Sequence, residues 1–357
     1  MKALKNKKIL IPAILVIICL VIGVTAFSMY TAKLKAPSTT PEKVIFEVKE
    51  GEGNASVLDK LEKAGLIQDV QAAKLCMKLQ GLNDIKFGVF TLDRSWDTET
   101  ILENLNDVKK AKQNEVMITF KEGMWAKDIA QSLQHKLGVN AKNLLKLWND
   151  DTYLKELMKT YPFLTKDILN DKTRVKLEGY LFPETYTFAK DADEKEITKT
   201  FLDHFQKIYQ KYEKDIVSSK FTMHEILTLA SMVQYEASTK EDMQLIAGVF
   251  FNRLDKDMML QSSVTVCYAL YDDLTSGEDC EVNPDIDSLY NTYTYKYKGL
   301  PIGPILNPGE DAIQAVLHPT KSDYLYFVAD VYGDGKVHYA KSYEEQLQNQ
   351  EKFHLNK

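Results

Sequence analysis

The sequence is poor in cysteine and has no excess of basic charge. Four cysteines occur in 357 residues and none forms a CxxC pair, which argues against a disulfide scaffold and against a zinc site. Lysine and arginine number 45 against 51 acidic residues, a net charge of −6, so no basic field favours nucleic acid as a partner. With 45% hydrophobic and 27% charged residues, the composition excludes a disordered chain, a collagen-like fibre and a polytopic membrane protein. The length allows two or three globular domains.

Long hydrophobic runs are missing too, with one exception near the N-terminus. Ile9–Met29 is a run of 21 residues without a charge, and four lysines precede it. About 20 apolar residues cross a bilayer as a helix, and flanking lysines stay on the cytoplasmic side. We therefore expect a cytoplasmic tail (1–8), a transmembrane anchor (9–29) and an extracytoplasmic remainder. A cleaved signal peptide ending near Val24-Thr25-Ala26 is the alternative, although signal cores span only about 7–15 residues.

The composition of the segment after the anchor predicts a short linker. Residues 30–43 contain two prolines, small polar residues and no apolar period. Outside the cytoplasm a disulfide between Cys267 and Cys280 becomes possible, because twelve residues separate them in an oxidising compartment. Two unpaired small core residues are an equally supported interpretation.

Short strand and helix patterns follow the linker, and they predict an α+β fold. A small domain (44–112) is expected to contain strands at 44–49 and 88–92 and helices at 55–64, 70–79 and 98–105. A similar strand, Gly turn and helix then occupy 116–120, 122–123 and 126–133 at the start of a larger domain (113–357). Two copies of one small element suggest a binding module. Coincidence is the alternative, because strand–turn–helix units are common.

The larger domain is expected to be mostly helical, with a terminal hairpin. Amphipathic patterns with a charged, solvated face cover 141–159 and 194–212. Strongly apolar helices are predicted at 223–235 and 241–258. The C-terminal strands are predicted at 323–330 and 336–340, around the glycines at 333 and 335.

Two groups of acidic side chains are candidates for carbohydrate chemistry. Glu178 and Glu184 lie among aromatic residues in LEGYLFPETYTF, which resembles a sugar-binding surface. A core strand pair with both glutamates bonded to backbone explains the same pattern slightly better. Glu236 follows the apolar helix directly, and an apolar surround together with the negative pole of the helix raises a carboxyl pKa. A raised pKa suits a general acid, whereas a partly exposed terminal glutamate is the ordinary interpretation.

Polar side chains downstream of Glu236 are candidates for a sugar-binding groove. Gln261, Ser262 and Thr265 are expected at a helix-to-strand transition, where they are suited to hydrogen-bond hydroxyl or acetamido groups. The following segment, YNTYTYKYKGLPIGPILNPG, is dense in Tyr, Asn, Pro and Gly, which is typical of a rigid loop.

Taken together, these motifs resemble the YceG-like family of membrane-anchored endolytic murein transglycosylases. LEGYLFPETY, LASMVQYEAS, IAGVFFNRL, LQSSVTV, YNTYTYKYKGLPIGPILNPG, HPTKSDYLYFVAD and HYAKSYEE occur in the family's order. The resemblance covers residue 44 to the C-terminus. It implies a LysM-like small domain, a catalytic domain, no cofactor or metal, and cleavage of the MurNAc-β-1,4-GlcNAc bond in nascent peptidoglycan.

The resemblance also implies roles for individual residues. The family's catalytic glutamate falls on Glu236, as general acid and then base. Its groove motifs fall on the residues implied to bind or support substrate: Gln261, Ser262, Thr265, Tyr290, Asn291, Tyr293, Glu184 and Tyr186. This chain departs from the family at Gln234, where a glutamate is usual, at Ser263 and Val264, which replace Asp-Pro, and at Gln346, where histidine is common.

Three functions remain open at this point. A lytic transglycosylase needs one carboxylate and leaves a 1,6-anhydro-MurNAc end, which terminates glycan elongation. A muramidase pairs Glu236 with Glu184 or Asp242 and leaves reducing ends. A decayed peptidoglycan-binding scaffold is the third, favoured by the departures at Gln234 and Ser263. By resemblance, the partners are penicillin-binding synthases and elongation or division proteins.

Overall fold

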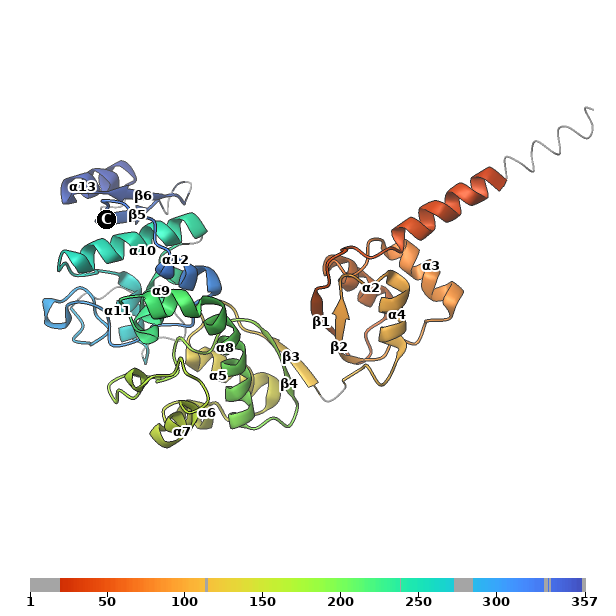
Figure 1. Cartoon of the computed structure of the whole chain (residues 1–357), viewed down its shortest axis with the longest axis horizontal. Helices are drawn as coiled ribbons and strands as arrows, with labels where there is room; N and C mark the ends of the chain where they lie inside the picture. Colours follow the sequence, from red (N-terminus) through yellow and green to blue (C-terminus); the bar gives the residue numbers. More distant parts are fainter. Residues whose placement is uncertain are drawn as a thin grey trace, which may run out of the picture. The chain divides into compact units, whose positions relative to one another are not determined.

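The computed structural model describes residues 20–112, 115–237, 239–272, 285–330, 333 and 335–354. These form two compact units (Figure 1). The first unit comprises the described residues up to Met117 together with Thr187–Lys190, and the second comprises Ile118–Tyr186 and the described residues from Asp191 on. Both units combine helices with small sheets, so the fold is α+β, as the sequence predicts.

The first unit is a two-stranded sheet covered by helices. Its strands pair antiparallel, with Lys43 opposite Asp93 and Val48 opposite Gly88. Alternate strand residues such as Phe46 and Phe90 are buried against the apolar faces of the helices. All predicted elements are present with ends shifted by one or two residues: β1 (Lys43–Val48), α2 (Asn54–Lys63), α3 (Val70–Gln80), β2 (Gly88–Asp93) and α4 (Thr98–Asn106).

The N-terminal predictions fall mainly on residues that are not described. The tail (1–8) and residues 9–19 of the predicted anchor lie outside the described residues. Residues 20–33 are helical. In the described part of the chain, no helix is both long enough and apolar enough to cross a membrane.

The predicted linker is bound to the first unit instead of extending freely from it. Leu34 packs against the core, and its carbonyl accepts a hydrogen bond from the Thr98 amide at 2.9 Å. The Gln68 side chain donates to the carbonyls of Lys35 and Ala36, each at 3.1 Å. These contacts hold the segment between the helix and β1 in place.

The second unit is mainly helical. Its N-terminal strand pairs with a strand far along the chain to form a two-stranded sheet, and the division between the two units crosses this sheet. The C-terminal hairpin is confirmed, with Tyr326 opposite Ala340. The elements are β3 (Glu115–Thr119), α5 (Ala126–Leu137), α6 (Ala141–Leu147), α7 (Asp151–Leu157), β4 (Thr185–Ala189), α8 (Glu194–Ser218), α9 (Met223–Glu236), α10 (Lys240–Asp255), α11 (Ser263–Ala269), α12 (Glu310–Leu317), β5 (Tyr326–Ala329), β6 (Val337–Ala340) and α13 (Tyr343–Lys352).

One prediction for this unit was wrong, and one stretch is divided more finely than predicted. The stretch 141–159 is helical, as predicted, but it forms two helices, because the Asp150 side chain caps a new helix by accepting from the Tyr153 amide, while Trp148 is buried and bonded to Thr198. The segment after Ser262 is a helix and not a strand. Its β-branched residues favour a strand locally, but burial on all sides and hydroxyl-to-backbone hydrogen bonds stabilise the helical turn.

The cysteines are described in part. Cys267 is disulfide-bonded, whereas Cys280 lies outside the described residues, as does Cys19. Cys76 is a free thiol buried in the first unit.

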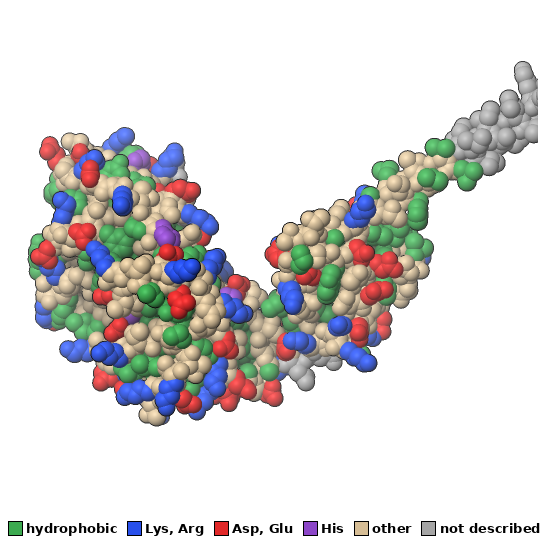
Figure 2. Space-filling model, viewed as in Figure 1, with side chains coloured by type: hydrophobic (Ala, Val, Ile, Leu, Met, Phe, Trp, Pro, Cys, Tyr) green, Lys and Arg blue, Asp and Glu red, His purple; other side chains and the backbone are tan. Residues whose placement is uncertain are grey.

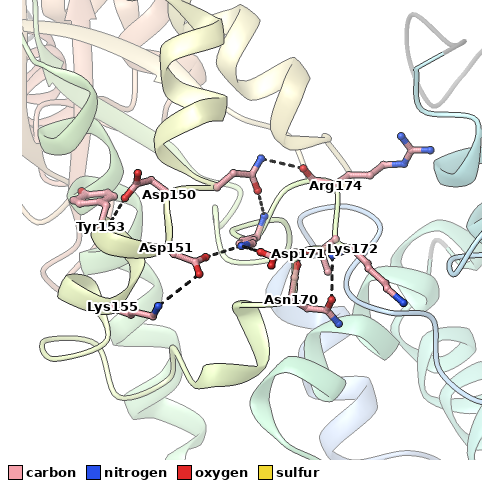
Figure 3. Close-up of polar contacts among 11 residues, drawn as sticks. Asp150, Asp151, Tyr153, Lys155, Asn170, Asp171, Lys172 and Arg174 are labelled. Carbon is pink, nitrogen blue, oxygen red and sulfur yellow. Dashed lines mark hydrogen bonds and ion pairs between the residues drawn. The ribbon is translucent and has the colours of Figure 1, made fainter.

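A polar network fixes the segment that leads into LEGYLFPETY (Figure 3). Lys176 is buried, and its ammonium pairs with Asp151 at 2.6 Å and with Asp171 at 2.8 Å. Asn149 donates to the Arg174 carbonyl and accepts from the Lys176 amide. Buried charges are tolerated only when paired, so this network places the next residues in one position.

Gly179 lies directly after this network and has a conformation that requires glycine. Its φ is +88°, and a Cβ atom at this position would lie 2.6 Å from the Pro304 ring. The absence of a side chain thus permits LEGYLFPETY to pack against the Gly299–Ile305 loop.

We expect Gly179→Ala to destabilise the second unit by at least about 2 kcal/mol, because it combines left-handed strain with a clash against a rigid ring. Gly138→Ala is the matched control, since Gly138 has φ +77° and open space around its Cα. The control substitution should lower the free energy of unfolding by only about 1 kcal/mol, because it adds backbone strain without a clash. Urea unfolding, monitored by the fluorescence of buried Trp125 and Trp148, measures both. Equal losses would contradict the assigned clash.

Candidate active site

The site is built at the C-terminal end of α9. This helix begins at a capping box formed by Thr222 and Glu225, and its side chains are buried from Met223 to Val233. Because α9 is enclosed along nearly its whole length, its last residue, Glu236, is held at a fixed position. Glu236 is partly buried at the point where the helix leaves the core.

A serine hydroxyl binds the Glu236 carboxylate. Ser262 Oγ donates to Glu236 Oε1 at 2.6 Å, and Ser262 itself is buried. Burial raises the pKa of Glu236, while the hydrogen bond from Ser262 acts in the opposite direction. The carboxyl group is therefore suited to hold a proton at a higher pH than an exposed glutamate does.

The turn that carries Ser262 is fixed by hydroxyl groups. The Ser262 amide donates to Thr292 Oγ1 at 3.0 Å, and Thr265 Oγ1 donates to the Ser262 carbonyl at 2.7 Å. Thr265 and Thr292 also share a hydrogen bond at 2.9 Å. Gln261, just before the turn, has φ +50°, a left-handed conformation that few non-glycine residues adopt. This local strain is offset by the surrounding hydrogen bonds.

Tyr293 belongs to the same site. Burial and then the negative charge of Glu236 raise the pKa of Tyr293, which places its hydroxyl within electrostatic reach of the carboxylate. Asn291 is buried and braces this tyrosine, because its Oδ1 accepts from the Tyr293 amide at 2.8 Å. Both residues line a pocket of about 470 Å³ that continues to Asp285 and Lys296.

The structure brings most of the predicted residues together. Ser262 binds Glu236 directly, and hydrogen bonds from Gln261, Ser262 and Thr265 reach Thr292, which lies between Asn291 and Tyr293 in the chain. Tyr290 is buried behind them, and its hydroxyl accepts from the Arg174 amide at 3.1 Å.

Glu184 and Tyr186 lie in another cluster. Tyr186 is buried against Phe201 and His204 and donates to the Phe182 carbonyl at 2.8 Å. Glu184 is exposed at the turn before β4 and accepts from the Thr185 amide.

Glu178 is the buried carboxyl group whose importance the sequence pattern concealed. Its oxygens accept from the Ala126 amide at 2.9 Å, from Tyr268 Oη at 2.9 Å and from Asn307 Nδ2 at 2.7 Å. Burial raises its pKa to about 8, against the hydrogen bonds, which favour the charged form. The predicted alternative, a glutamate bonded to backbone, is correct for Glu178, although it lies in a turn and not in a strand.

Arg253 is a support residue that sequence reasoning missed. Its buried guanidinium donates to the carbonyls of Met259 and Leu260 and to Gln261 Oε1, at 2.9–3.2 Å. It also lies over the Tyr326 ring. Arg253 therefore fixes the strained turn at Gln261. In the sequence, only its place in the motif IAGVFFNRL could have indicated this role.

Among the residues that the structure describes, no group of three or more His, Cys, Asp or Glu side chains is placed to hold a metal ion.

The departure at Gln234 is accommodated by two hydrogen bonds. Gln234 Nε2 donates to Glu122 at 3.1 Å, and its Oε1 accepts from the Gly309 amide at 2.8 Å. An amide satisfies both partners, whereas a carboxylate satisfies only Gly309 and repels Glu122.

We expect Gln234→Glu to lower the free energy of unfolding at pH 7 by up to about 1 kcal/mol, since the pair is solvent-accessible. Denaturant unfolding of the variant and of the wild-type chain at pH 7 measures this loss. In a Glu122→Gln background, Gln234→Glu should no longer lower the free energy of unfolding. An equal loss in that background would refute the contact between Gln234 and Glu122.

Comparison with known proteins identifies the relatives of this chain. The model of the YceG-like family matches residues 46–352. An endolytic murein transglycosylase of Streptococcus pneumoniae (serotype 2, strain D39) is 34% identical over 329 residues, which cover 88% of this chain and 59% of that protein. The chain thus spans about three-fifths of the length of its pneumococcal relative.

Two further relatives match over most of their length. An endolytic murein transglycosylase of Bacillus subtilis (strain 168) is 33% identical over 331 residues, covering 91% of this chain and 89% of that protein. The crystal structure of a YceG-like protein from Listeria monocytogenes is similar with a TM-score of 0.59 and 31% identity, covering 87% of this chain and all of that one. On the match over residues 46–352 and these identities, the chain belongs to the YceG-like family.

Proposed function

We propose that this chain is an endolytic lytic transglycosylase that cleaves the MurNAc-β-1,4-GlcNAc bond of nascent peptidoglycan. Family membership and the names of the relatives support the activity. The observation that carries the proposal is the Glu236–Ser262 pair at 2.6 Å, a partly buried carboxyl group with raised pKa beside Tyr293. Such a carboxyl group can give up a proton and later take one back.

In the first step, protonated Glu236 acts as general acid. Its proton passes to the glycosidic oxygen as the bond from that oxygen to the muramic C1 breaks. The GlcNAc hydroxyl leaves, and the sugar's own acetamido oxygen stabilises the positive charge that develops at C1. The Ser262 hydrogen bond and Tyr293 then stabilise the carboxylate that remains.

In the second step, the Glu236 carboxylate acts as general base. It takes the proton of the muramic C6 hydroxyl, and O6 forms a bond to C1. The product is a 1,6-anhydro-MurNAc end, no water is consumed, and Glu236 is protonated again. One carboxyl group therefore completes the cycle.

The other candidate carboxylates already accept hydrogen bonds from neighbouring groups, which favours a mechanism with one carboxylate over a muramidase. The Asp242 carboxylate accepts hydrogen bonds from Tyr339 Oη at 2.7 Å and from Thr239 Oγ1. It therefore stabilises the first turn of α10. Glu184 is bonded to the turn before β4. A two-carboxylate hydrolase needs its second group roughly 5–9.5 Å from the first, across the scissile bond.

The departures from the family pattern do not disturb the pair that performs the chemistry. Ser263 takes the first position of α11, directly after Ser262, and Gln234 satisfies its own partners. We therefore favour an active enzyme over a scaffold.

The proposal extends to location and partners. Residues 9–29 would anchor the chain as a single-pass protein of the bacterial cell membrane with the N-terminus in the cytoplasm, and the site would act on strands emerging nearby. The β1–α2–α3–β2 order of the first unit is consistent with a LysM-like glycan-binding module. Penicillin-binding synthases and elongation or division proteins are the proposed partners, by family resemblance.

We expect Glu236→Gln to abolish glycan cleavage while leaving the fold intact, because the amide can neither donate nor accept the transferred proton. The measurement is digestion of purified glycan strands by the full chain, with mass spectrometry of the new ends. Glu184→Gln serves as the matched control and should retain activity, since Glu184 lies outside the site.

Each outcome distinguishes the alternatives. Anhydro ends that vanish in Glu236→Gln support the transglycosylase. Reducing ends would assign a muramidase. Glycan binding without cleavage by the wild-type chain would leave a scaffold.

We expect Ser262→Ala to raise the pKa of Glu236 further, because the hydrogen bond that favours the charged carboxylate is lost. Activity requires protonated Glu236 in the first step, so the alkaline limb of the pH–rate profile should move to higher pH. Ser263→Ala is the neighbouring control and should leave the limb in place. If both variants follow the wild-type profile, the role assigned to Ser262 is wrong.

A further inference from the structure

The first unit presents apolar side chains to solvent on α3. Leu75 and Leu79 lie one turn apart, and they are 45% and 66% exposed. Lys74 and Lys78 are exposed beside them. The opposite face of α3 is buried in the core through residues such as Met77. We call the four exposed residues the α3 stripe; leucines at this spacing on an outward face are unusual for a helix that contacts only water.

The helix at 20–33 is docked on α3. Tyr30 lies beside Cys76, because burial and then the nearby thiol raise the pKa of the tyrosine, and the Lys33 ammonium pairs with Asp69 at 2.6 Å. Leu34 and the residues after it are bonded to the same unit, as described above. The helix and the first unit therefore form one body and are not joined by a free tether.

The α3 stripe lies on the side of α3 next to this docked helix. With 3.6 residues per turn, Leu79 projects about 60° around the axis from Cys76, which contacts Tyr30. Figure 1 shows α3 at the end of the first unit from which the helix leaves, running across the direction of that helix. Figure 2 shows hydrophobic side chains both along the helix and on the surface of the unit next to its base.

Most of the exposed residues of the helix are apolar, although Thr25, Ser28 and Lys33 are exposed as well. Leu20, Phe27 and Met29 are more than 60% exposed. These residues belong to the described part of the predicted anchor, so the anchor meets α3 near Tyr30. Where the anchor runs along the membrane normal, a helix that crosses its end lies parallel to the membrane surface.

We propose that the α3 stripe contacts the lipid surface and seats the first unit against the outer face of the membrane. This inference rests on the anchor in the proposed function. Leu75 and Leu79 would enter the boundary between headgroups and acyl chains, while Lys74 and Lys78 extend to the headgroups. Asp97, Glu99 and Glu103 act electrostatically on nearby Cys76, so the surface is not uniformly basic and the leucines provide the main attraction.

The test uses the full chain reconstituted in vesicles that contain lipids brominated on the acyl chains. Bromine quenches tryptophan fluorescence only within the lipid. Leu75→Trp and Leu79→Trp add a tryptophan to the α3 stripe, and Leu347→Trp on α13 is the matched control, because Leu347 is 41% exposed. The fluorescence added by each substitution, relative to wild type, is compared between brominated and ordinary lipids.

We expect brominated lipid to remove most of the fluorescence added at 75 and 79 and little of that added at 347. If the chain floats with the vesicles but neither stripe tryptophan is quenched, the α3 stripe faces water or protein, and this inference fails while the anchor stands. If the chain does not float with the vesicles, the anchor and the inference both fail. Equal quenching at all three positions would indicate non-specific adsorption and also overturn it.

Discussion

The second unit depends on one buried carboxyl group, that of Glu178. Three donors converge on it: the Ala126 amide at the start of α5, Tyr268 Oη on α11 and Asn307 Nδ2 after the Gly299–Ile305 loop. Removing any one of these donors leaves a buried polar atom unpaired, at a cost of about 1–3 kcal/mol. These donors come from positions 126, 268 and 307, so the interaction joins segments that the chain itself keeps apart.

The geometry of the candidate site follows from this junction. Glu178 holds α11 through Tyr268, and the first turn of α11 carries Ser262 and Thr265. The loop held by Asn307 also reaches α9, because the Ile305 amide donates to Ser231 Oγ at 3.0 Å. Glu236 ends α9 and Ser262 begins α11, so their 2.6 Å contact is the result of two elements positioned by one buried network.

Much of the architecture was predictable because it depends on local pattern. In the first unit, apolar periodicity located each helix and strand to within one or two residues, and the structure shows side-chain caps at Asp69 and Asp97. Patterns failed where tertiary burial outweighed propensity. The β-branched run after Ser262 became a helix, and the stretch 141–159 broke at Asp150. The linker's composition also gave no sign that Leu34 would enter the core.

The sequence by itself determined the α+β class, the apolar helix that ends at Glu236 and the membership of this residue in a set of ordered motifs. These are properties of neighbouring residues and their periods, which a linear pattern records. Only the tertiary structure decided that Ser262 binds Glu236, that Tyr293 lies within electrostatic reach of this carboxylate and that Glu178 supports the fold. It also decided that Glu184 and Tyr186 lie in a separate cluster. The physical reason is that burial and hydrogen bonds between distant segments, and not residue type, decide which polar groups share one site.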